Sequence, residues 1–343
     1  MHASQRRIAI VGAGFAGLAL GFYLTYSASK QFQVTLLHQD PLGYGASGVA
    51  SGLLHPFPAA ATKLSFHGHQ ALHESLTLLQ YLQSHATLPL YEGGGIIKLA
   101  IKDEDKRHFA KLCLSQDSLV FCSPKMLQKH LHLTNAYPGV MIKPGYTVYC
   151  KEYLHALASA FTSGGGKLER CKVTSLDEIK DFDAIILCTG AGIKEFDQVT
   201  KLQFVKGQIL TMEFPFPIVS KSIIGQGYIT KTSHPLIYHV GSSYEHHFKD
   251  SAPDLAKAKE LILKPWIKIF PQMSAGKILS CDAGVRVMYP KTYLPVISRL
   301  SSKVYRFTGL GSRGLLYHAY LAKQLATALE QGSLEKITRE FLQ

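Results

Sequence analysis

Apolar residues near the N-terminus follow a pattern that predicts a strand, a turn, a helix and a second strand. The β-branched run at 8–11 ends on glycine and is typical of a buried parallel strand. Helical spacing of apolar residues then covers 18–28, and the apolar run at 33–37 predicts the next strand. After a glycine-rich loop, a helix is expected over 71–83, with one apolar face formed by Leu72, Leu76, Leu79 and Leu82.

The same kind of pattern returns in two later parts of the chain. Buried strands are predicted at 183–188 and 304–308, and helices are predicted at 150–161 and 315–329. Strands that alternate with helices form parallel sheets, so we expect these segments to join the N-terminal unit. The first domain is therefore predicted to be discontinuous in sequence.

The middle of the chain has a different periodicity. Short strands with alternating apolar residues and turn residues between them, as at 207–212 and 237–240, predict an antiparallel sheet. A strand followed by a charged, exposed helix is expected over 98–111. Another helix, with Pro253 in its first turn, is expected over 253–264. Together these elements predict a second domain.

The length of the chain agrees with two domains. A chain of 343 residues and 37.8 kDa exceeds what one hydrophobic core usually organises. We predict an α/β fold, α+β overall, with a Rossmann-like domain that comprises residues 1–88, 146–204 and 282–343. The second domain, with an antiparallel sheet, is expected to comprise 89–145 and 205–281 and to hold the substrate.

The charge of the chain is strongly positive, because 37 Lys and Arg stand against 24 Asp and Glu and give a formal net charge of +13. This excess favours anionic partners and permits nucleic acid, although a general compositional habit would explain it equally well. Two rows of basic residues could follow a phosphate backbone or form ordinary solvated helix faces, namely Lys98, Lys102, Lys106, Arg107 and Lys111, and Lys257, Lys259, Lys264 and Lys268.

The cysteines and the apolar segments bear on where the protein resides. The six cysteines have neither a paired framework nor a C-x-x-C spacing, which is typical of a reducing compartment. The N-terminal segment imitates a signal peptide but contains four glycines, and no other segment reaches the roughly 20 consecutive apolar residues of a membrane span. We expect a soluble, cytoplasmic protein without a membrane partner.

A first glycine motif lies between the first predicted strand and helix. Gly12-x-Gly14-x-x-Gly17 suits a tight turn, a close approach of the backbone to a pyrophosphate, and phosphates that face the helix N-terminus. The carboxylate that usually binds the ribose at the end of the second strand is replaced by His38, with Asp40 two residues later. The motif predicts a dinucleotide site.

A second glycine motif, Gly309-x-Gly311-x-x-Gly314, also lies between a predicted strand and a helix. No strand follows it, so it does not predict a second nucleotide fold. Its backbone N–H groups and Arg313 suit an anionic ring system or a carboxylate. With one nucleotide fold and no separate nicotinamide domain, we expect tightly bound FAD rather than NAD(P).

A series of motifs occurs in the order found in the D-amino-acid oxidase and glycine oxidase superfamily, which the chain resembles over nearly its whole length. They are Gly12 to Gly17, Gly45-Ala46-Ser47-Gly48 with Gly52-Leu53-Leu54-His55-Pro56, Leu187 to Gly192, Val205-Lys206-Gly207-Gln208, Gly284-Val285-Arg286, and Gly309 to Gly314. The chain also resembles the oxidase half of the bifunctional tRNA 5-methylaminomethyl-2-thiouridine biosynthesis enzymes, in part through Gly227-Tyr228-Ile229-Thr230 and Gly241-Ser242-Ser243-Tyr244. The methyltransferase half of those enzymes has no counterpart in this sequence.

The resemblance implies which residues hold FAD and substrate. The implied FAD contacts are Gly12, Gly14, Phe15, Ala16, Gly17, His38, Asp40, Ala46, Ser47, Gly52, Leu53, Val173, Thr189, Gly190, Gly311, Ser312, Arg313, Gly314 and Leu315. Arg286 would bind a substrate carboxylate bidentately, with a surface salt bridge as the alternative. Tyr228 and Tyr244 would line the substrate pocket, with core packing as the alternative. Arg313 would stabilise negative charge or serve a structural role.

The activity that the resemblance implies is the oxidation of a secondary, glycine-type amine. The expected substrate is the carboxymethylaminomethyl group of a tRNA wobble uridine, with glyoxylate as a product and molecular oxygen as the final acceptor. An oxidase of free glycine, sarcosine or a D-amino acid would keep the same fold and chemistry. A non-catalytic flavoprotein that serves as a binding factor is the third possibility, against which the presence of Arg286, Tyr228 and Arg313 argues.

The histidines raise the question of a metal site. His67-x-His69-x-x-x-His73 and His246-His247 bring several imidazoles together in the sequence. No acidic residue or cysteine accompanies them at the spacing of a metal ligand, and the adjacent leucine face would leave them solvated. We expect no metal.

Overall fold

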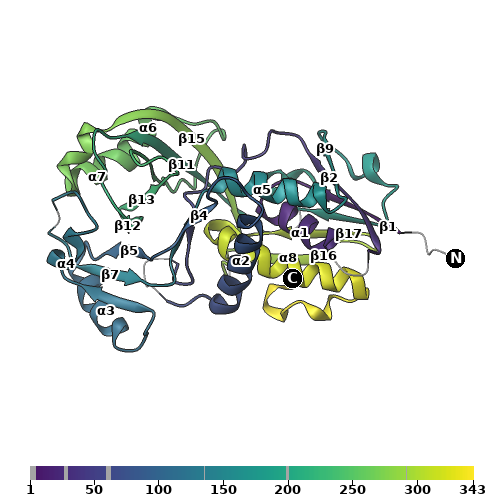
Figure 1. Ribbon diagram of the computed structural model, residues 1–343. Coiled ribbons are helices and arrows are strands. Elements are labelled where there is room, and N and C mark those ends of the chain that lie inside the picture. Colours follow the sequence, from purple (N-terminus) through teal and green to yellow (C-terminus); the bar gives the residue numbers. More distant parts are fainter. Residues whose placement is uncertain (1–4, 27–29, 59–62, 135, 198–200, 291) are drawn as a thin grey trace.

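The computed structural model describes residues 5–26, 30–58, 63–134, 136–197, 201–290 and 292–343, which form two lobes (Figure 1). One lobe is built on a six-stranded sheet and the other on an eight-stranded sheet. A small sheet joins them through a hydrogen bond of 2.7 Å between the hydroxyls of Thr147 and Ser222, and its strands are β3 (Leu53–Leu54), β8 (Tyr146–Val148) and β4 (Tyr91–Glu92). The predicted α/β class is confirmed.

The six-stranded sheet has the order β16-β17-β10-β1-β2-β9. All neighbouring strands in it run parallel except β16 and β17, which are antiparallel. The order reverses at β1, because the chain first moves outward to β2 and later returns to β10 on the other side, and ligands of such sheets bind at this switch point. The strands are β1 (Arg6–Val11), β2 (Phe32–His38), β9 (Lys167–Arg170), β10 (Ala184–Leu187), β16 (Val296–Arg299) and β17 (Val304–Thr308).

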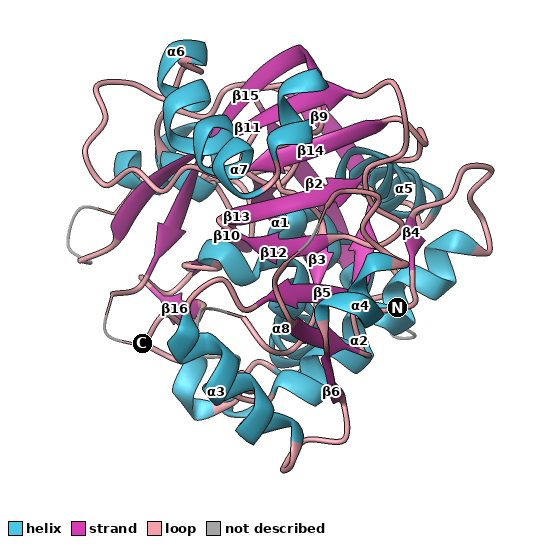
Figure 2. Ribbon diagram, turned by 90° about the vertical axis from the view of Figure 1, so that its left-hand side faces the viewer, coloured by secondary structure: helices cyan, strands magenta, loops and turns pink. Residues whose placement is uncertain are grey.

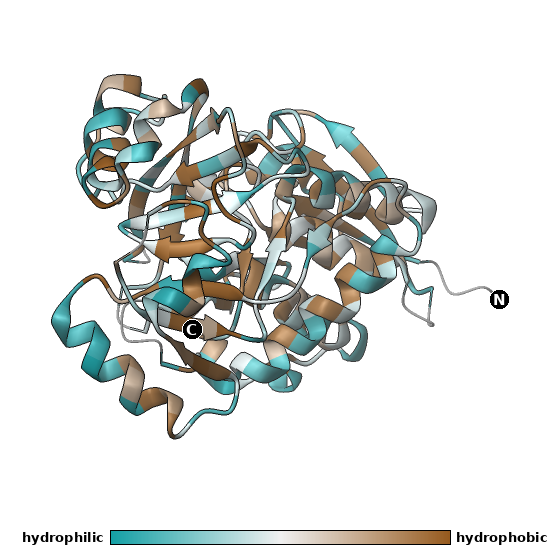
Figure 3. Cartoon of the chain, turned by 60° about the vertical axis from the view of Figure 1, so that its left-hand side comes forward, coloured by the Kyte–Doolittle hydropathy of each residue, from teal (hydrophilic) through white to brown (hydrophobic). Residues whose placement is uncertain are grey.

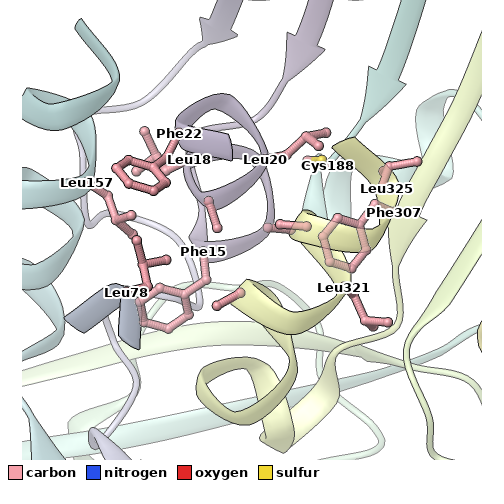
Figure 4. Packing of buried hydrophobic residues seen from close by; sticks show 14 of the residues in the cluster. Phe15, Leu18, Leu20, Phe22, Leu78, Leu157, Cys188, Phe307, Leu321 and Leu325 are labelled. Atoms are coloured by element: carbon pink, nitrogen blue, oxygen red, sulfur yellow. The ribbon is translucent and has the colours of Figure 1, made fainter. Parts of the chain in front are cut away.

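The core of this lobe surrounds α1 (Phe15–Thr25), which is apolar on nearly every side. Figure 4 shows its residues Phe15, Leu18 and Phe22 packed among side chains of the neighbouring helices. These helices are α2 (Gly68–Gln83), α5 (Cys150–Ser163) and α8 (Gly314–Gln331). α1 begins three residues before the predicted position 18, because Gly14 already serves as its N-cap. The packing therefore fixes the start of α1, where the first glycine motif lies.

A buried histidine ties α8 to α5 inside this core. His318 is fully buried, its Nε2 lies 2.6 Å from the hydroxyl of Tyr153, and its Nδ1 lies 3.1 Å from the carbonyl oxygen of Gly314. Burial lowers the pKa of His318 to about 4. The imidazole is therefore neutral, with Nδ1–H donating to the carbonyl and Nε2 accepting from Tyr153. This link holds the first turn of α8 against the core.

The eight-stranded sheet has the order β15-β11-β14-β13-β12-β5-β7-β6. It is mostly antiparallel, as predicted, but β5 and β12 pair in parallel, so the sheet is mixed. β11 and β15 run across positions 204 and 282, and the domain borders placed there stay a prediction. The strands are β5 (Ile96–Leu99), β6 (Leu119–Cys122), β7 (Gly139–Ile142), β11 (Gln203–Glu213), β12 (Ile223–Gly225), β13 (Gly227–Lys231), β14 (Ile237–Gly241) and β15 (Lys277–Met288).

One face of this sheet is covered by α6 (Leu255–Ala258), a π-helical turn (Lys259–Leu263) and α7 (Lys264–Ile269), which lie across the strands in Figure 2. Trp266 packs there against apolar residues of the strands such as Leu210 and Val240. Figure 3 shows the strands mainly in the hydrophobic colour and the outer helices with hydrophilic faces. Side chains alternate along a strand, so Ile209, next to Leu210, and Gly241, next to Val240, lie on the face of the sheet away from these helices.

The structure corrects two predictions in this lobe. Pro253 lies before the helix rather than in its first turn, because Asp254 is the N-cap and accepts the N–H of Lys257 at 3.0 Å. Lys98 does not belong to an exposed helical row. It lies on β5, is 7% exposed, and its ammonium group stands 5.4 Å from the ring centre of Phe109 on α3 (Asp103–Cys113). The short helix α4 (Pro124–Gln128) completes this side.

Candidate active site

The loop between β1 and α1 has the form that the first glycine motif predicts. Gly12 has φ +112°, and a Cβ atom there would collide with the carbonyl oxygen of Cys188. A Cβ atom on Gly17 would collide with the carbonyl oxygen of Gly12. The N–H of Phe15 donates to Oγ of Ser47 at 3.1 Å, and a Cβ atom on Gly14 would meet this same Oγ at 3.0 Å. The helix N-terminus and the loop around Ser47 are therefore adjacent.

His38 stands at the end of β2, where a carboxylate usually binds the ribose of a dinucleotide. Nδ1 of His38 bonds instead to the backbone carbonyl of Asp40 at 2.8 Å. The N–H of Cys171 donates to the carbonyl oxygen of His38 at 2.9 Å, and Val173 is buried two residues later. Contacts of His38, Asp40 and Val173 with a cofactor stay a prediction.

The carboxyl end of β10 offers a buried hydroxyl without a partner. Oγ1 of Thr189 is enclosed and has no hydrogen-bond partner among the described residues. Gly190, with φ +54°, follows it and leaves open space where a Cβ atom would lie. A buried polar atom usually has a partner, so this hydroxyl fits a polar ligand placed against the sheet edge.

The loop from 45 to 53 connects the nucleotide side of the site to the second lobe. A Cβ atom on Gly284 of β15 would come within 2.8 Å of Cα of Ala46, so the two backbones are in close contact. Gly52 has φ +83°, and its carbonyl accepts the N–H of Val148 at 2.7 Å. Leu53 then pairs with β8. These contacts hold the loop between the glycine motif and β15.

Arg286 lies on β15 and reaches across the face of the sheet that α6 and α7 leave open. Its guanidinium group occupies the space above Gly207, where any Cβ atom would collide with Nη2. Nη2 donates to Oγ of Ser242 at 2.6 Å. Arg286 is half-buried. The ion pairs of the described residues do not include Arg286, so the alternative of a surface salt bridge has no support among them.

Tyr228 lies on the same face of the sheet as Arg286. It pairs with Gly241 across β13 and β14, and a Cβ atom on Gly241 would lie 3.0 Å from Cε2 of its ring. Because Ser242 directly follows Gly241, the phenol and the guanidinium group approach the same end of β14. This pair can bind a carboxylate by two N–H donors and a phenolic hydroxyl.

Tyr244 and Arg313 lie at the margins of this arrangement. Tyr244 is 52% exposed, and its hydroxyl lies 3.5 Å from Sδ of Met288. Burial raises the pKa of Tyr244, and the nearby charge of Arg286 opposes this rise. Arg313 ends the 3-10 turn Gly311–Arg313, and its charge partly offsets the burial that raises the pKa of Tyr317. Direct roles of Tyr244 and Arg313 toward a substrate stay predictions.

The second glycine motif forms the start of α8, one residue before the predicted 315. Gly309 and Gly311 have φ +75° and +53°, and the bridge between Met288 and Leu310 joins the motif to β15. The buried side chain of Leu315 belongs to the core, whereas Ser312 is exposed. A Cβ atom on Gly314 would lie 3.6 Å from the ring of Phe15, so the second motif lies beside the start of α1 and the first motif.

Sequence reasoning missed the residues that give Arg286 its position. Gly207, Ser242 and Gly241 stand in motifs that carried the resemblance, but no role was assigned to them. The signal that could have found them is cross-strand pairing, which places small residues opposite large ones on adjacent strands. This pairing depends on register, which the sequence pattern left open.

Some members of the basic rows and one of the histidines contact side chains of the protein itself. Lys106 pairs with Asp103 at 2.7 Å and Lys264 with Glu260 at 2.9 Å, so acidic residues on the same helices balance the basic ones. Nδ1 of His67 lies 2.8 Å from the hydroxyl of Tyr320. Within the described ranges, no group of three or more His, Cys, Asp or Glu residues could hold a metal ion. No helix in the described part of the chain is long and apolar enough to cross a membrane.

Four features at this sheet edge would together suit a dinucleotide: the glycine cradle, the helix N-terminus, the hydroxyl of Thr189 and the loop at Ser47. The comparisons agree with this fit. The sequence profile of the family described as DAO, FAD dependent oxidoreductase, matches residues 7–328.

Solved structures with the same fold include several oxidases. Glycine oxidase from Geobacillus kaustophilus is similar with a TM-score of 0.81 at 19% identity over 96% of both chains. Iminodiacetate oxidase from Chelativorans sp. BNC1 is similar with a TM-score of 0.81 at 18% identity over 98% of both chains. Glycine oxidase from Bacillus cereus ATCC 14579 has a TM-score of 0.81 at 17% identity, over 99% of this chain and 100% of that one.

Proposed function

Because the chain belongs to the DAO family of FAD dependent oxidoreductases, we propose that it oxidises the C–N bond of an amine that carries a carboxymethyl group. The observation that carries the proposal is the placement of Arg286. Its guanidinium group lies over Gly207 and beside Ser242, within reach of a carboxylate that Tyr228 would also contact. An amine without a carboxylate would leave this guanidinium group without an anionic partner.

FAD is the cofactor, and the residues that would hold it are the glycine motif at 12–17, Ser47, the loop at 52–53 and Thr189. When bound, FAD supplies the two-electron acceptor for the oxidation, and molecular oxygen is the expected final oxidant. The protein's own contribution is to hold the carboxylate and to orient the neighbouring C–N bond.

The chemistry requires no protein nucleophile. The substrate R–NH–CH2–COO⁻ loses a hydride from the α-carbon and a proton from nitrogen, which leaves the imine R–N=CH–COO⁻. Water then hydrolyses the imine to glyoxylate and the amine R–NH2. Arg286 and Tyr228 would fix the carboxylate throughout, so the α-carbon stays in one position.

The size of R separates two candidate substrates. The names of the similar structures, glycine oxidase and iminodiacetate oxidase, support a small N-substituted glycine. The net charge of +13 favours the carboxymethylaminomethyl group of a tRNA wobble uridine as the second candidate. The ion pairs of Lys106 and Lys264 with acidic neighbours count for the small molecule, because they reduce the charge available to phosphates.

The salt dependence of turnover separates these candidates. Glyoxylate is measured with N-methylglycine and with tRNA bearing carboxymethylaminomethyluridine, each below saturation, at 50 and 200 mM KCl. We expect the FAD-loaded protein to oxidise N-methylglycine at rates that differ less than about twofold, because one carboxylate releases few counterions.

A tRNA substrate would behave differently, since each phosphate contact adds to the salt dependence. Loss of turnover by roughly tenfold or more at the higher salt, on tRNA only, would move the assignment to tRNA. Absence of glyoxylate from both substrates, while the protein holds FAD, would contradict the proposed function. The converted nucleoside is identified by mass spectrometry of the digested tRNA.

A further inference from the structure

The segment after β14 presents its side chains alternately to the site and to the interior. Ser242 accepts a hydrogen bond from Arg286, and Tyr244 contacts Met288. The residues between and after them, Ser243 and Glu245, are 3% and 6% exposed. The position of the site-facing residues therefore depends on what holds the buried ones.

A hydrogen-bonded network holds them. Oε1 of Glu245 accepts from Oγ of Ser243 at 2.6 Å and from Nε2 of Gln208 at 2.9 Å. The N–H of Gln208 donates to Oγ of Ser243 at 2.9 Å, and Oε1 of Gln208 accepts the N–H of Asp254 at 2.6 Å. Backbone bonds between Lys206 and Glu245 close the network from the side of β11.

Lys257 supplies the charge that this network requires. Its ammonium group lies 2.7 Å from Oε2 of Glu245, whose side chain is 5% exposed. A carboxylate taken out of water needs a cationic partner or several donors. Burial raises the pKa of Glu245, but Lys257, Ser243 and Gln208 together hold it below its usual range. Glu245 is therefore an ionised group that binds three partners at once.

The network and the carboxylate anchor share the same backbone. Gln208 directly follows Gly207, over which the guanidinium group of Arg286 lies, and Ser243 directly follows Ser242, which accepts from that group. Gly207 and Gln208 are adjacent on β11 and therefore face opposite sides of the sheet. A shift of the buried face would thus move both surfaces that Arg286 contacts.

We propose that Glu245 is a positioning residue that sets the carboxylate affinity of Arg286 through Gln208, Ser243 and the backbone of Ser242. The inference rests on the proposed function, because it concerns the same anchor. It also assigns Lys257, a member of one basic row, to an internal ion pair instead of a phosphate contact.

The test measures carboxylate binding directly. Acetate is titrated into the FAD-loaded protein, and its Kd is read from the visible absorption of the flavin. We expect Glu245→Ala to raise this Kd by about tenfold, because Arg286 loses its fixed position. Glu245→Gln, which keeps an oxygen acceptor for Ser243, should recover part of the loss. The KM for N-methylglycine should follow the Kd, with kcat changed by less than about twofold.

The matched control is Lys264→Met, which removes an ion pair of similar length between exposed side chains on the next helix. It should leave the acetate Kd unchanged, whereas Lys257→Met should raise it. Should Glu245→Ala yield no folded protein, Ser243→Ala takes its place, since Oγ of Ser243 bridges Gln208 and Glu245.

Two outcomes are distinct. If acetate binding requires Arg286 but is unchanged in Glu245→Ala, or in Ser243→Ala where that variant replaces it, the role of Glu245 is overturned and the proposed function stands. If the parent and Arg286→Ala bind acetate equally, the anchor itself is wrong and both proposals fail.

Discussion

Replacement of Arg286 by Ala should lower kcat/KM for N-methylglycine on the order of a hundredfold, while FAD stays bound. The guanidinium group is half-buried, and its Nη2 bonds to Ser242 at 2.6 Å. The variant would lose the charge-assisted hydrogen bonds between this guanidinium group and the substrate carboxylate. Loss of one partner from a contact of that kind costs roughly 3 kcal/mol, which corresponds to about a hundredfold in kcat/KM. Steady-state kinetics and the flavin absorption of the purified variant measure both effects.

Arg286→Lys separates charge from geometry at the same position. A lysine keeps the positive charge but presents a point charge instead of two parallel N–H donors, and its stem does not lie over Gly207 in the same way. We expect this variant to remain well below the parent. Turnover equal to that of the parent would show that Arg286 does not anchor the carboxylate by a fork.

Gly14→Val should weaken FAD binding while the protein stays folded. The Cβ atom at this position would meet the side chain of Ser47 and no backbone atom, with Oγ at 3.0 Å, so the local backbone tolerates a side chain. The added methyl groups would instead occupy the approach of the pyrophosphate to the helix N-terminus. A clash of this kind costs about 1–3 kcal/mol, so FAD affinity should fall by about tenfold or more.

Gly17→Ala provides the contrast. Its Cβ atom would collide with the backbone carbonyl of Gly12, which cannot move aside like a serine hydroxyl. We expect this variant to lower the thermal unfolding temperature as well as the FAD content. Retention of full FAD in Gly14→Val, measured by absorption after gel filtration, would refute the placement of the pyrophosphate at this helix.

The parts of the fold that the sequence predicted are those in which local pattern and packing agree. β1, β10 and β17 are short apolar runs that become buried parallel strands, and the glycine motif between β1 and α1 has the strained backbone that only glycine adopts freely. α5 begins at the predicted residue 150, but α1 and α8 begin three residues and one residue before their predicted starts, because the apolar spacing does not mark the N-cap.

The parts that the sequence left open depend on contacts between distant segments. Lys98 resembles a member of a basic helical row, but its strand pairs with β12 and buries it beside Phe109. Ser242 and Gly207 matter only because cross-strand register brings them to Arg286. Register is not encoded in the local alternation of polar and apolar residues. Arg286 could therefore be predicted from the sequence, whereas the residues that hold it in position could not.

The most direct test of the account is anaerobic reduction of the flavin by two matched amines, N-methylglycine and dimethylamine. They share a secondary nitrogen and differ in the carboxylate that Arg286 and Tyr228 would bind. We predict that N-methylglycine bleaches the flavin absorption in the parent, that dimethylamine does not, and that Arg286→Ala removes the difference. Equal bleaching by both amines, or none by N-methylglycine in a protein that holds FAD, would contradict the assignment of a carboxymethyl amine as the substrate.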